Sequence, residues 1–327
     1  MAPEKLSLAR LPTPLWRHDA LDALVGTEVW VKRDDVSGGA EAGNKIRKLE
    51  YLFAEALQRG ATTVITCGGF QSNHARATAI LARQLELRPA LLLRTTQPDA
   101  RPDRGNAFLD VLVGAEIRTI PPERYPQRMA LMQDWAAELA AAGERAYVIP
   151  EGGSSPLGAL GYVDAMAELR VQLDAGEGGA PGSFDAVVHA CGSGGTAAGV
   201  VLGAGRFGIA PRVLAVAVCD DRSYFEPLIQ RLANDASGLL GGDRETPAEL
   251  EVDDRWKGPG YGVASAEQLR FIVAVGRECG LLLDPVYTGK AMFGLSRMPE
   301  KPTRALFIHT GGLPGLLAQS EDFAAHL

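Results

Sequence analysis

The order of segments along the chain predicts an α/β protein whose mostly parallel sheets are covered by helices on both faces. Two observations lead to this fold class. Short β-rich apolar segments alternate with longer amphipathic ones, and several of the β-rich segments end in paired glycines. In open α/β sheets, ligands bind beyond the carboxyl ends of the strands, where glycine lets the backbone approach them closely. We therefore expect the functional site at these glycine pairs.

The individual elements follow from apolar spacing and from stop signals. In the segment 46–58, for example, Leu49, Leu52 and Phe53 recur at helical spacing and Gly60 ends the pattern. A polar stretch with prolines is expected as a loop, and a glycine-rich stretch as a linker; these are 95–106 and 175–183. The expected strands are 28–32, 62–67, 90–94, 115–120, 147–150, 186–191, 213–219 and 306–310. The expected helices are 46–58, 71–85, 127–142, 157–173 and 267–276.

Composition excludes several classes of function. The 327 residues carry a net charge of −7, and a nucleic-acid-binding surface needs clustered lysine and arginine. No apolar run approaches the ~20 residues needed to cross a bilayer. The four cysteines form neither a CxxC pair nor a zinc spacing, and no signal-peptide-like segment opens the chain. We expect no nucleic-acid partner, no membrane, no metal, and a reducing, cytoplasmic location.

The first stretch that carries chemistry is Gly43-Asn44-Lys45, which leads from a loop into a predicted helix. The positive potential near a helix N-terminus favours the neutral form of a lysine, and a neutral amine is what carbonyl chemistry requires. A solvated, charged first turn of the helix explains the same pattern, so from spacing alone both interpretations stay open.

Two further stretches join a strand to a helix through glycines. In Gly68-Gly69-Phe70-Gln71-Ser72-Asn73-His74, the polar side chains suit either an anion site or simple helix caps. In Cys191-Gly192-Ser193-Gly194-Gly195-Thr196, successive glycines suit a phosphate-binding loop or a bare tight turn. The second stretch fits a dinucleotide fingerprint only loosely, and it is not a Walker loop.

Two tyrosines, Tyr261 and Tyr287, lie in turn-like segments, where such residues commonly only pack. His309 ends the last expected strand and is best interpreted as a core histidine with a hydrogen-bond partner.

Taken together, the motifs resemble the pyridoxal-phosphate (PLP) family of D-cysteine desulfhydrase and 1-aminocyclopropane-1-carboxylate (ACC) deaminase, which has the fold of the tryptophan synthase β-subunit (fold type II). The resemblance covers nearly the whole chain, with the motifs in the same order. Its further motifs are Leu11-Pro12-Thr13-Pro14-Leu15, Lys32-Arg33-Asp34-Asp35, Arg47-Lys48-Leu49-Glu50, Leu157-Gly158-Ala159-Leu160-Gly161-Tyr162, Asp284-Pro285-Val286-Tyr287 and Gly311-Gly312. It implies two open, twisted sheets with PLP in the cleft between a large domain (1–51 plus 154–327) and a small domain (52–153), and a homodimer.

The resemblance also implies the roles of individual residues. Lys45 would form the Schiff base with PLP, Asn73 would bind its ring hydroxyl, and Lys48 would help to hold its phosphate. Ser72 would bind the substrate carboxylate or handle a proton at its α-carbon. The remaining implied residues are Gly192, Ser193, Gly194, Gly195, Thr196 and Thr310 for the cofactor, and Asn73, His74, Tyr261, Tyr287 and Thr288 for the substrate.

Within the family, Thr288 and Thr310 resemble the desulfhydrase pair, since deaminases carry Glu and Leu at these positions. A neutral hydroxyl cannot keep the pyridine nitrogen protonated as a carboxylate would, and a weaker electron sink is sufficient to expel hydrosulfide. The expected reaction is β-elimination: Lys45 or Ser72 removes the α-proton, hydrosulfide leaves, and hydrolysis gives pyruvate and ammonia.

Several alternatives stay open. One is the deaminase of the cyclic substrate; another is a lyase for a different β-substituted amino acid, such as L-cysteate or β-chloroalanine. A non-catalytic binder of PLP or a nucleotide and a Rossmann dehydrogenase are rivals from other classes. Ala42 replaces the glycine that the family often has, and Phe70 is expected to narrow the pocket. Cys67 and Cys191, next to two of the loops, are interpreted as small apolar core residues.

Overall fold

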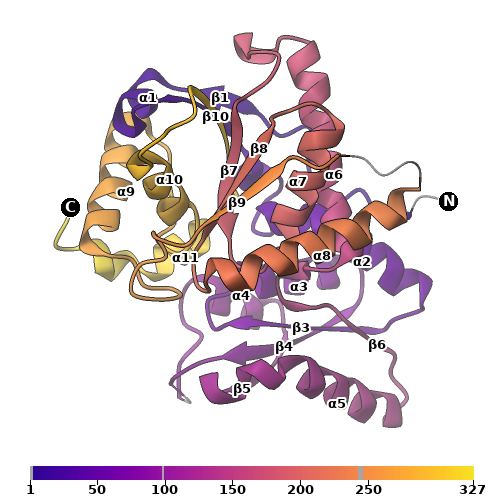
Figure 1. The fold of residues 1–327 in the computed structure, drawn as a ribbon. Helices are drawn as coiled ribbons and strands as arrows, with labels where there is room; N and C mark the ends of the chain where they lie inside the picture. Colours follow the sequence, from indigo (N-terminus) through magenta and orange to yellow (C-terminus); the bar gives the residue numbers. More distant parts are fainter. Residues whose placement is uncertain (1–2, 98, 242–245) are drawn as a thin grey trace.

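The computed structural model describes residues 3–97, 99–241 and 246–327. Two sheets organise the chain, and both are mostly parallel (Figure 1). The larger has the strand order β1-β2-β10-β7-β8-β9, in which only the β1–β2 pair is antiparallel. The smaller has the order β5-β4-β3-β6, and all its pairs are parallel. The predicted fold class is confirmed.

The elements of the larger sheet come from both ends of the sequence. Its strands are β1 (Leu15–Arg17), β2 (Glu28–Lys32), β7 (Ala186–Cys191), β8 (Arg212–Ala217), β9 (Glu249–Asp253) and β10 (Arg304–Ile308). Its helices are α1 (Asp19–Val25), α6 (Pro156–Asp174), α7 (Gly195–Arg206), α8 (Arg222–Leu240), α9 (Ala266–Cys279), α10 (Thr288–Arg297) and α11 (Leu313–Ala318).

Alternation along the strands gives this sheet two apolar faces, as expected for a sheet covered on both sides. In β7, Val187 faces the core formed with α6, α7 and α8, whereas Val188 faces the core formed with α1, α9 and α10. In Figure 1 the two helix layers lie on opposite sides of the sheet, with α6 and α7 on one side and α9 and α10 on the other.

The smaller sheet is continuous in sequence. Its strands are β3 (Thr63–Gly69), β4 (Arg88–Arg94), β5 (Glu116–Ile120) and β6 (Ala146–Val148). Helices α2 (Asn44–Gln58), α3 (Asn73–Gln84) and α4 (Gly105–Leu112) pack on one face, and α5 (Arg128–Ala141) packs on the other. The smaller sheet lies below the larger one in Figure 1. The domain boundaries 52–153 and 1–51 plus 154–327 stay a prediction.

The short 3-10 segments connect these elements and are Asp34–Val36, Pro122–Gln127, Glu151–Gly153, Glu177–Gly179 and Ser320–Phe323. Every expected strand and helix is present, with ends shifted by a few residues. The sequence reasoning did not name α1, α4, α8, α10, α11, β1 or β9; α4 begins at Gly105, within the stretch expected as a loop. Within the described ranges no helix is both long and apolar enough to cross a membrane.

Candidate active site

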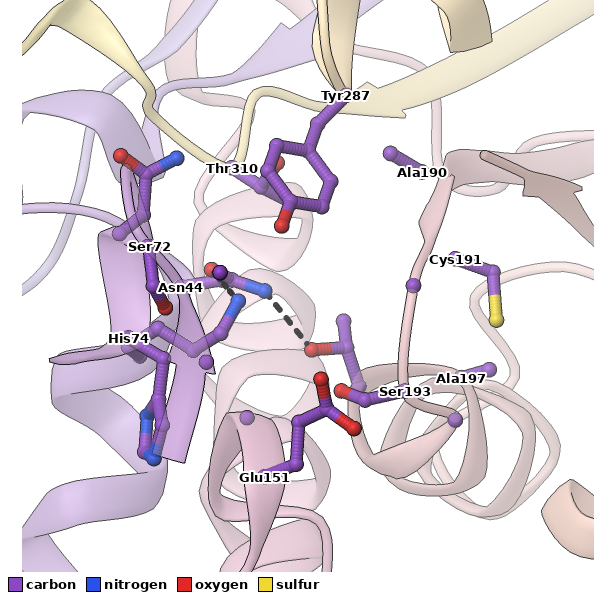
Figure 2. Close-up of a pocket in the computed structure, with 18 of the residues that line it drawn as sticks. Asn44, Ser72, His74, Glu151, Ala190, Cys191, Ser193, Ala197, Tyr287 and Thr310 are labelled. Carbon is purple, nitrogen blue, oxygen red and sulfur yellow. Dashed lines mark hydrogen bonds between the residues drawn. The ribbon is translucent and has the colours of Figure 1, made fainter. Parts of the chain in front are cut away.

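A pocket lies where strands of both sheets end. The carboxyl ends of β3, β7 and β10 meet there with the N-termini of α2, α3 and α7, which is where an α/β fold places ligands. Figure 2 shows Ser72 and His74 on one side, Ser193 and Ala197 on the other, and Tyr287 above. The lining residues are Asn44, Lys45, Gly68, Gly69, Ser72, Asn73, His74, Glu151, Gly152, Ala190, Cys191, Gly192, Ser193, Gly194, Thr196, Ala197, Tyr261, Tyr287 and Thr310.

Lys45 occupies the first turn of α2, where its amine faces the pocket. Gly43 precedes the helix with φ of +122°, a backbone conformation that glycine tolerates, and a Cβ there would lie 2.8 Å from the Thr310 carbonyl oxygen. The Lys45 Nζ donates to Asn44 Oδ1 at 2.9 Å. Burial, followed by the positive charge of Arg76, lowers the pKa of Lys45 to about 8. A much larger fraction of this amine is therefore neutral and nucleophilic near neutral pH than of an ordinary lysine.

A buried ionic network holds α2 in place from behind. The Arg47 guanidinium donates to both Asp34 oxygens at 2.9 and 2.8 Å, and to Glu168 at 2.9 Å. Lys32 also pairs with Glu168, at 2.5 Å. Tyr162 donates to Asp34 at 2.6 Å. The Lys32-Arg33-Asp34-Asp35 motif therefore contributes to the site structurally, because it ties β2 to the lysine-bearing helix and to α6.

The glycine loop after β7 forms the opposite wall. Gly194 has φ of +82° and precedes α7, whose first N–H, that of Gly195, donates to the Ser154 hydroxyl oxygen at 3.1 Å. The next N–H groups of this helix end and its positive partial charge suit an anion. Thr196 accepts a hydrogen bond from the Asn44 side chain at 3.0 Å, which links this wall to the lysine helix.

Lys48 is a buried basic residue whose surroundings suit an anionic ligand. Its side chain is buried, and its ammonium forms no hydrogen bond with any residue in the described part of the chain. Burial and the charge of Lys45 hold the pKa of Lys48 well below its usual range. It does not line the pocket itself. A buried, unpartnered amine is costly unless an anion pairs with it, so Lys48 fits a phosphate group in the adjoining loop.

Ser72 and Asn73 stand at the N-terminus of α3. The Ser72 Oγ accepts the Ala75 N–H at 3.2 Å, so it is a helix cap, and its hydroxyl hydrogen has no acceptor among the described residues. Asn73 Oδ1 accepts from Asn106 at 3.0 Å, which leaves the amide nitrogen of Asn73 free to donate. The helix-cap and ligand-site interpretations are thus compatible, because a cap uses only an acceptor lone pair of the serine.

His74 lies deeper and is buried. Its Nε2 lies 2.8 Å from the Thr66 hydroxyl, and its Nδ1 has no hydrogen-bond partner in the described chain. Burial and the charges of Lys45 and Lys48 hold the pKa of His74 well below its ordinary value. The ring is therefore neutral at physiological pH.

Tyr261 and Tyr287 meet over the pocket. Their hydroxyl oxygens lie 2.7 Å apart, and the Lys45 Nζ lies 5.8 Å from the centroid of the Tyr287 ring. Burial raises the pKa of Tyr261 to about 12 and that of Tyr287 well above its usual value. Because one hydroxyl donates to the other, the second hydroxyl hydrogen is free to donate to a ligand.

Asp284 holds the backbone of Tyr287 in place through hydrogen bonds. Its carboxylate accepts the N–H groups of Tyr287 at 2.9 Å and of Thr288 at 2.8 Å, and the Thr288 hydroxyl at 2.7 Å. Thr288 is therefore engaged in this turn and does not line the pocket. Its predicted contact with substrate stays a prediction, and the observed bonds give it a role in holding Tyr287. Thr310 does line the pocket, at the end of β10.

Among the pocket residues to which sequence reasoning gave no role, two have side chains that form hydrogen bonds, Asn44 and Glu151. Asn44 bonds both Lys45 and Thr196, and Glu151 follows β6. Asn44 belongs to the Gly43-Asn44-Lys45 motif, in which only the lysine was given a chemical role. The Gly152-Gly153 pair after a predicted strand was the available signal for Glu151.

Of two expectations about residues next to the pocket loops, the one for Phe70 is wrong and the one for the cysteines agrees with the structure. Phe70 does not narrow the pocket, because it packs against the small apolar cluster around Ala75 and Leu91. Cys67 and Cys191 lie in apolar cores as expected, and burial raises the pKa of each to about 12. Cys191 also lines the pocket, with its sulfur directed away from the centre in Figure 2. His309 is a buried histidine with a partner, 2.9 Å from the Leu282 carbonyl oxygen.

Comparison with known proteins identifies the family of the chain. Residues 6–311 match the family described as "Pyridoxal-phosphate dependent enzyme". The chain belongs to this family. It is 42% identical to the putative ACC deaminase of Thermotoga maritima, over 97% of this chain and 98% of the relative. It is also 42% identical to the mitochondrial bifunctional D-cysteine desulfhydrase/ACC deaminase of Arabidopsis thaliana, over 98% of this chain and 80% of that protein. The crystal structure of an ACC deaminase homologue superposes with a TM-score of 0.89 at 37% identity, covering 99% of this chain and 96% of that one.

The protein is therefore a PLP-dependent enzyme, and the site fits that cofactor. The buried Lys48 amine, which no described residue pairs with, and the N-terminus of α7 suit a phosphate group. A lysine with a lowered pKa is available for an aldehyde. The described residues contain no cluster of His, Cys, Asp or Glu that could hold a metal ion.

Proposed function

We propose that this enzyme eliminates hydrosulfide from D-cysteine and releases pyruvate and ammonia. The observation that carries the choice is the neutral hydroxyl of Thr310 in the pocket wall next to the lysine helix. A neutral partner supports the easier expulsion of a sulfur leaving group over the opening of a cyclopropane ring. The relative from Arabidopsis thaliana is named for both activities, so ACC deamination is the second candidate.

The cofactor is held, in this proposal, by Lys45, by Lys48 with the loop Gly192, Ser193, Gly194, Gly195 and Thr196, and by Asn73 and Thr310. When bound, PLP supplies an electron sink that stabilises negative charge at the α-carbon of an amino acid. The protein must then position the substrate, take one proton from that carbon and provide one to the leaving sulfur.

The residues of the pocket divide these tasks. The free hydroxyl hydrogen of Ser72 and the neighbouring N–H groups of α3 bind the substrate carboxylate, with Asn73 and His74 next to them. The Lys45 amine, neutral near its pKa of about 8, takes the α-proton, and Ser72 is the alternative base. The Tyr261–Tyr287 pair donates its free hydroxyl hydrogen toward the departing sulfur. Thr288 acts on the substrate only through Tyr287, whose turn it holds together with Asp284.

A side-by-side product assay on the purified, PLP-loaded enzyme tests this proposal. It offers D-cysteine, L-cysteine, L-cysteate, β-chloroalanine and ACC, and measures sulfide, sulfite, chloride and the 2-oxo acid. Sulfide and pyruvate from D-cysteine alone are expected. 2-Oxobutyrate from ACC, without sulfide from D-cysteine, would refute the Thr310 argument and establish the deaminase.

We also propose a homodimer, as the family resemblance implies, and a cytoplasmic location. The location is supported by the four cysteines, all of which are free thiols. Light scattering on the purified protein should give twice the chain mass, and cell fractionation should recover the enzyme with cytoplasmic markers.

A further inference from the structure

A second cavity adjoins the active-site pocket and shares Glu151, Gly192, Ser193 and Tyr261 with it. We call this cavity the vestibule. Its walls come from the end of β4, the 3-10 segment Pro122–Gln127, the start of α5 and the side of α8. Tyr261 lines both cavities, so a substrate group that extends beyond its ring enters the vestibule.

Arg94 is the unusual residue of the vestibule. It ends β4, paired in register with Gly69 of the pocket wall, and it is half-buried. Its guanidinium stacks between two tyrosine rings, 4.5 Å from the centroid of Tyr125 and 5.1 Å from that of Tyr261. Among the residues described, no carboxylate pairs with it and no acceptor takes a hydrogen bond from its side chain. The two rings orient the cation and leave its five N–H donors unused.

The other charges of the vestibule do not neutralise Arg94. Glu151 is engaged by Arg128, whose Nε lies 3.1 Å away, and by the Tyr125 hydroxyl. Asp220 is exposed to solvent, where water and salt screen its charge. Arg94 is therefore a fixed cation that faces the vestibule with free donors, which is the geometry that recognises a carboxylate.

We propose that Arg94 is a specificity-determining residue, and that it selects cysteine derivatives whose sulfur carries a short chain that ends in a carboxylate. The proposal rests on the β-elimination proposed above. The C–S bond breaks with its electron pair on sulfur, the α-proton goes to the protein base and the sulfur receives a proton. Hydrolysis of the remaining fragment with one water gives pyruvate and ammonia. The other product is the thiol acid, which in this proposal leaves through the vestibule.

The test compares two nearly isosteric substrates, S-carboxymethyl-D-cysteine and S-carbamoylmethyl-D-cysteine, which differ in charge at the far end. For the wild-type holoenzyme we expect kcat/KM to favour the carboxylate by about tenfold or more, the usual range of a charged hydrogen bond. Arg94→Met should abolish this preference and Arg94→Lys should keep part of it. Arg118→Met is the matched control, because Arg118 also stacks on an aromatic ring, 4.1 Å from the centroid of Trp135, and lines neither cavity.

An equal ratio for the two substrates in the wild-type enzyme, or a ratio that Arg94→Met leaves unchanged, would overturn the proposal. Failure of the proposed function is visible separately, as absence of sulfide from D-cysteine. In that case the two derivatives are titrated as ligands of the holoenzyme through its visible absorption. The ratio of their dissociation constants, and its loss in Arg94→Met, then decides whether the vestibule recognises the carboxylate.

Discussion

The two helices that carry the active-site residues have very different polar surroundings. Behind α2, Arg47 and Asp34 are buried, and Asp34 accepts hydrogen bonds from Arg47 at 2.9 and 2.8 Å and from Tyr162 at 2.6 Å. Around α3 and α4, buried polar atoms lack partners in the described chain; they are His74 Nδ1, Arg76 Nε, Thr78 Oγ1, Asn106 Oδ1 and both carboxylate oxygens of Asp110. Apart from Lys48, whose amine has no partner among the described residues, the polar groups behind α2 are satisfied within the protein, whereas the wall that receives the substrate has several buried groups that need water or ligand.

This difference matches the division of labour in the site. A lysine that forms a covalent bond must return to one position, and the ionic network provides that rigidity. A wall with unsatisfied groups gains hydrogen bonds when its surroundings change, so a ligand can alter its arrangement at little cost.

The largest effect is expected for Lys45→Ala, which removes the reactive amine from the rigid wall. Turnover should fall by about three orders of magnitude or more, since a positioned general base alone contributes about 10²–10⁴-fold. The check is the rate of 2-oxo acid formation, with circular dichroism to show that the fold is intact. Normal turnover by a folded Lys45→Ala enzyme would exclude the proposed role.

Loss of a buried arginine from α2, the wall that carries Lys45, should lower the free energy of unfolding more than the same loss from α3. Arg47→Met leaves Asp34 as a buried carboxylate without its cation, although Glu168 keeps its pair with Lys32, and should cost about 3–5 kcal/mol of unfolding free energy. Arg76→Met, the matched change on the other wall, removes a buried guanidinium that donates to the Ala42 carbonyl at 2.9 Å and should cost about 1–2 kcal/mol. Urea unfolding of both variants measures the difference, and equal losses would contradict the comparison.

Asp110 should make the substrate wall sensitive to pH. Burial raises the pKa of this carboxyl to about 8, so the folded protein keeps a proton that the unfolded chain loses near pH 4. Folding therefore becomes less favourable as pH rises from about 4 to 8, and the penalty is constant above that. Asp110→Asn removes the titration, so the variant should gain stability relative to wild type across this window. Parallel stability curves for the two proteins between pH 4 and 8 would show that Asp110 ionises normally.

Much of the fold and part of the site could be predicted from sequence, and the boundary has a physical basis. Apolar spacing in the segment 46–58 and the paired glycines after 62–67 are local signals, and both elements formed as expected. The chemistry of Lys45 was also local, since it depends on a glycine and a helix start. The engagement of Thr288 by Asp284 is likewise short-range, but it depends on side-chain rotamers that no pattern records.

What the sequence could not show depends on contacts between distant segments. Arg94 belongs to a strand that was predicted, yet its role depends on two tyrosine rings far away in the chain. The buried polar atoms of α3 and α4 that lack hydrogen-bond partners also could not be predicted, because residue type does not tell whether a buried donor finds an acceptor.

The smallest effect concerns the influence of one wall on the other. Arg76 stands on the substrate wall, and after burial its charge is the largest cause that lowers the pKa of Lys45 to about 8. Only the neutral amine attacks an aldehyde, so the rate at which the apoenzyme takes up PLP covalently should rise with pH and level off above about 8. Removing the Arg76 charge makes the ammonium form of Lys45 more favourable, so Arg76→Met should move this midpoint to higher pH. The visible absorption of the covalently bound cofactor gives the rate at each pH, and Arg83→Met, an exposed arginine in the last turn of α3, is the control. An unchanged midpoint in Arg76→Met would mean that burial alone sets the reactivity of Lys45 and that the two walls act independently.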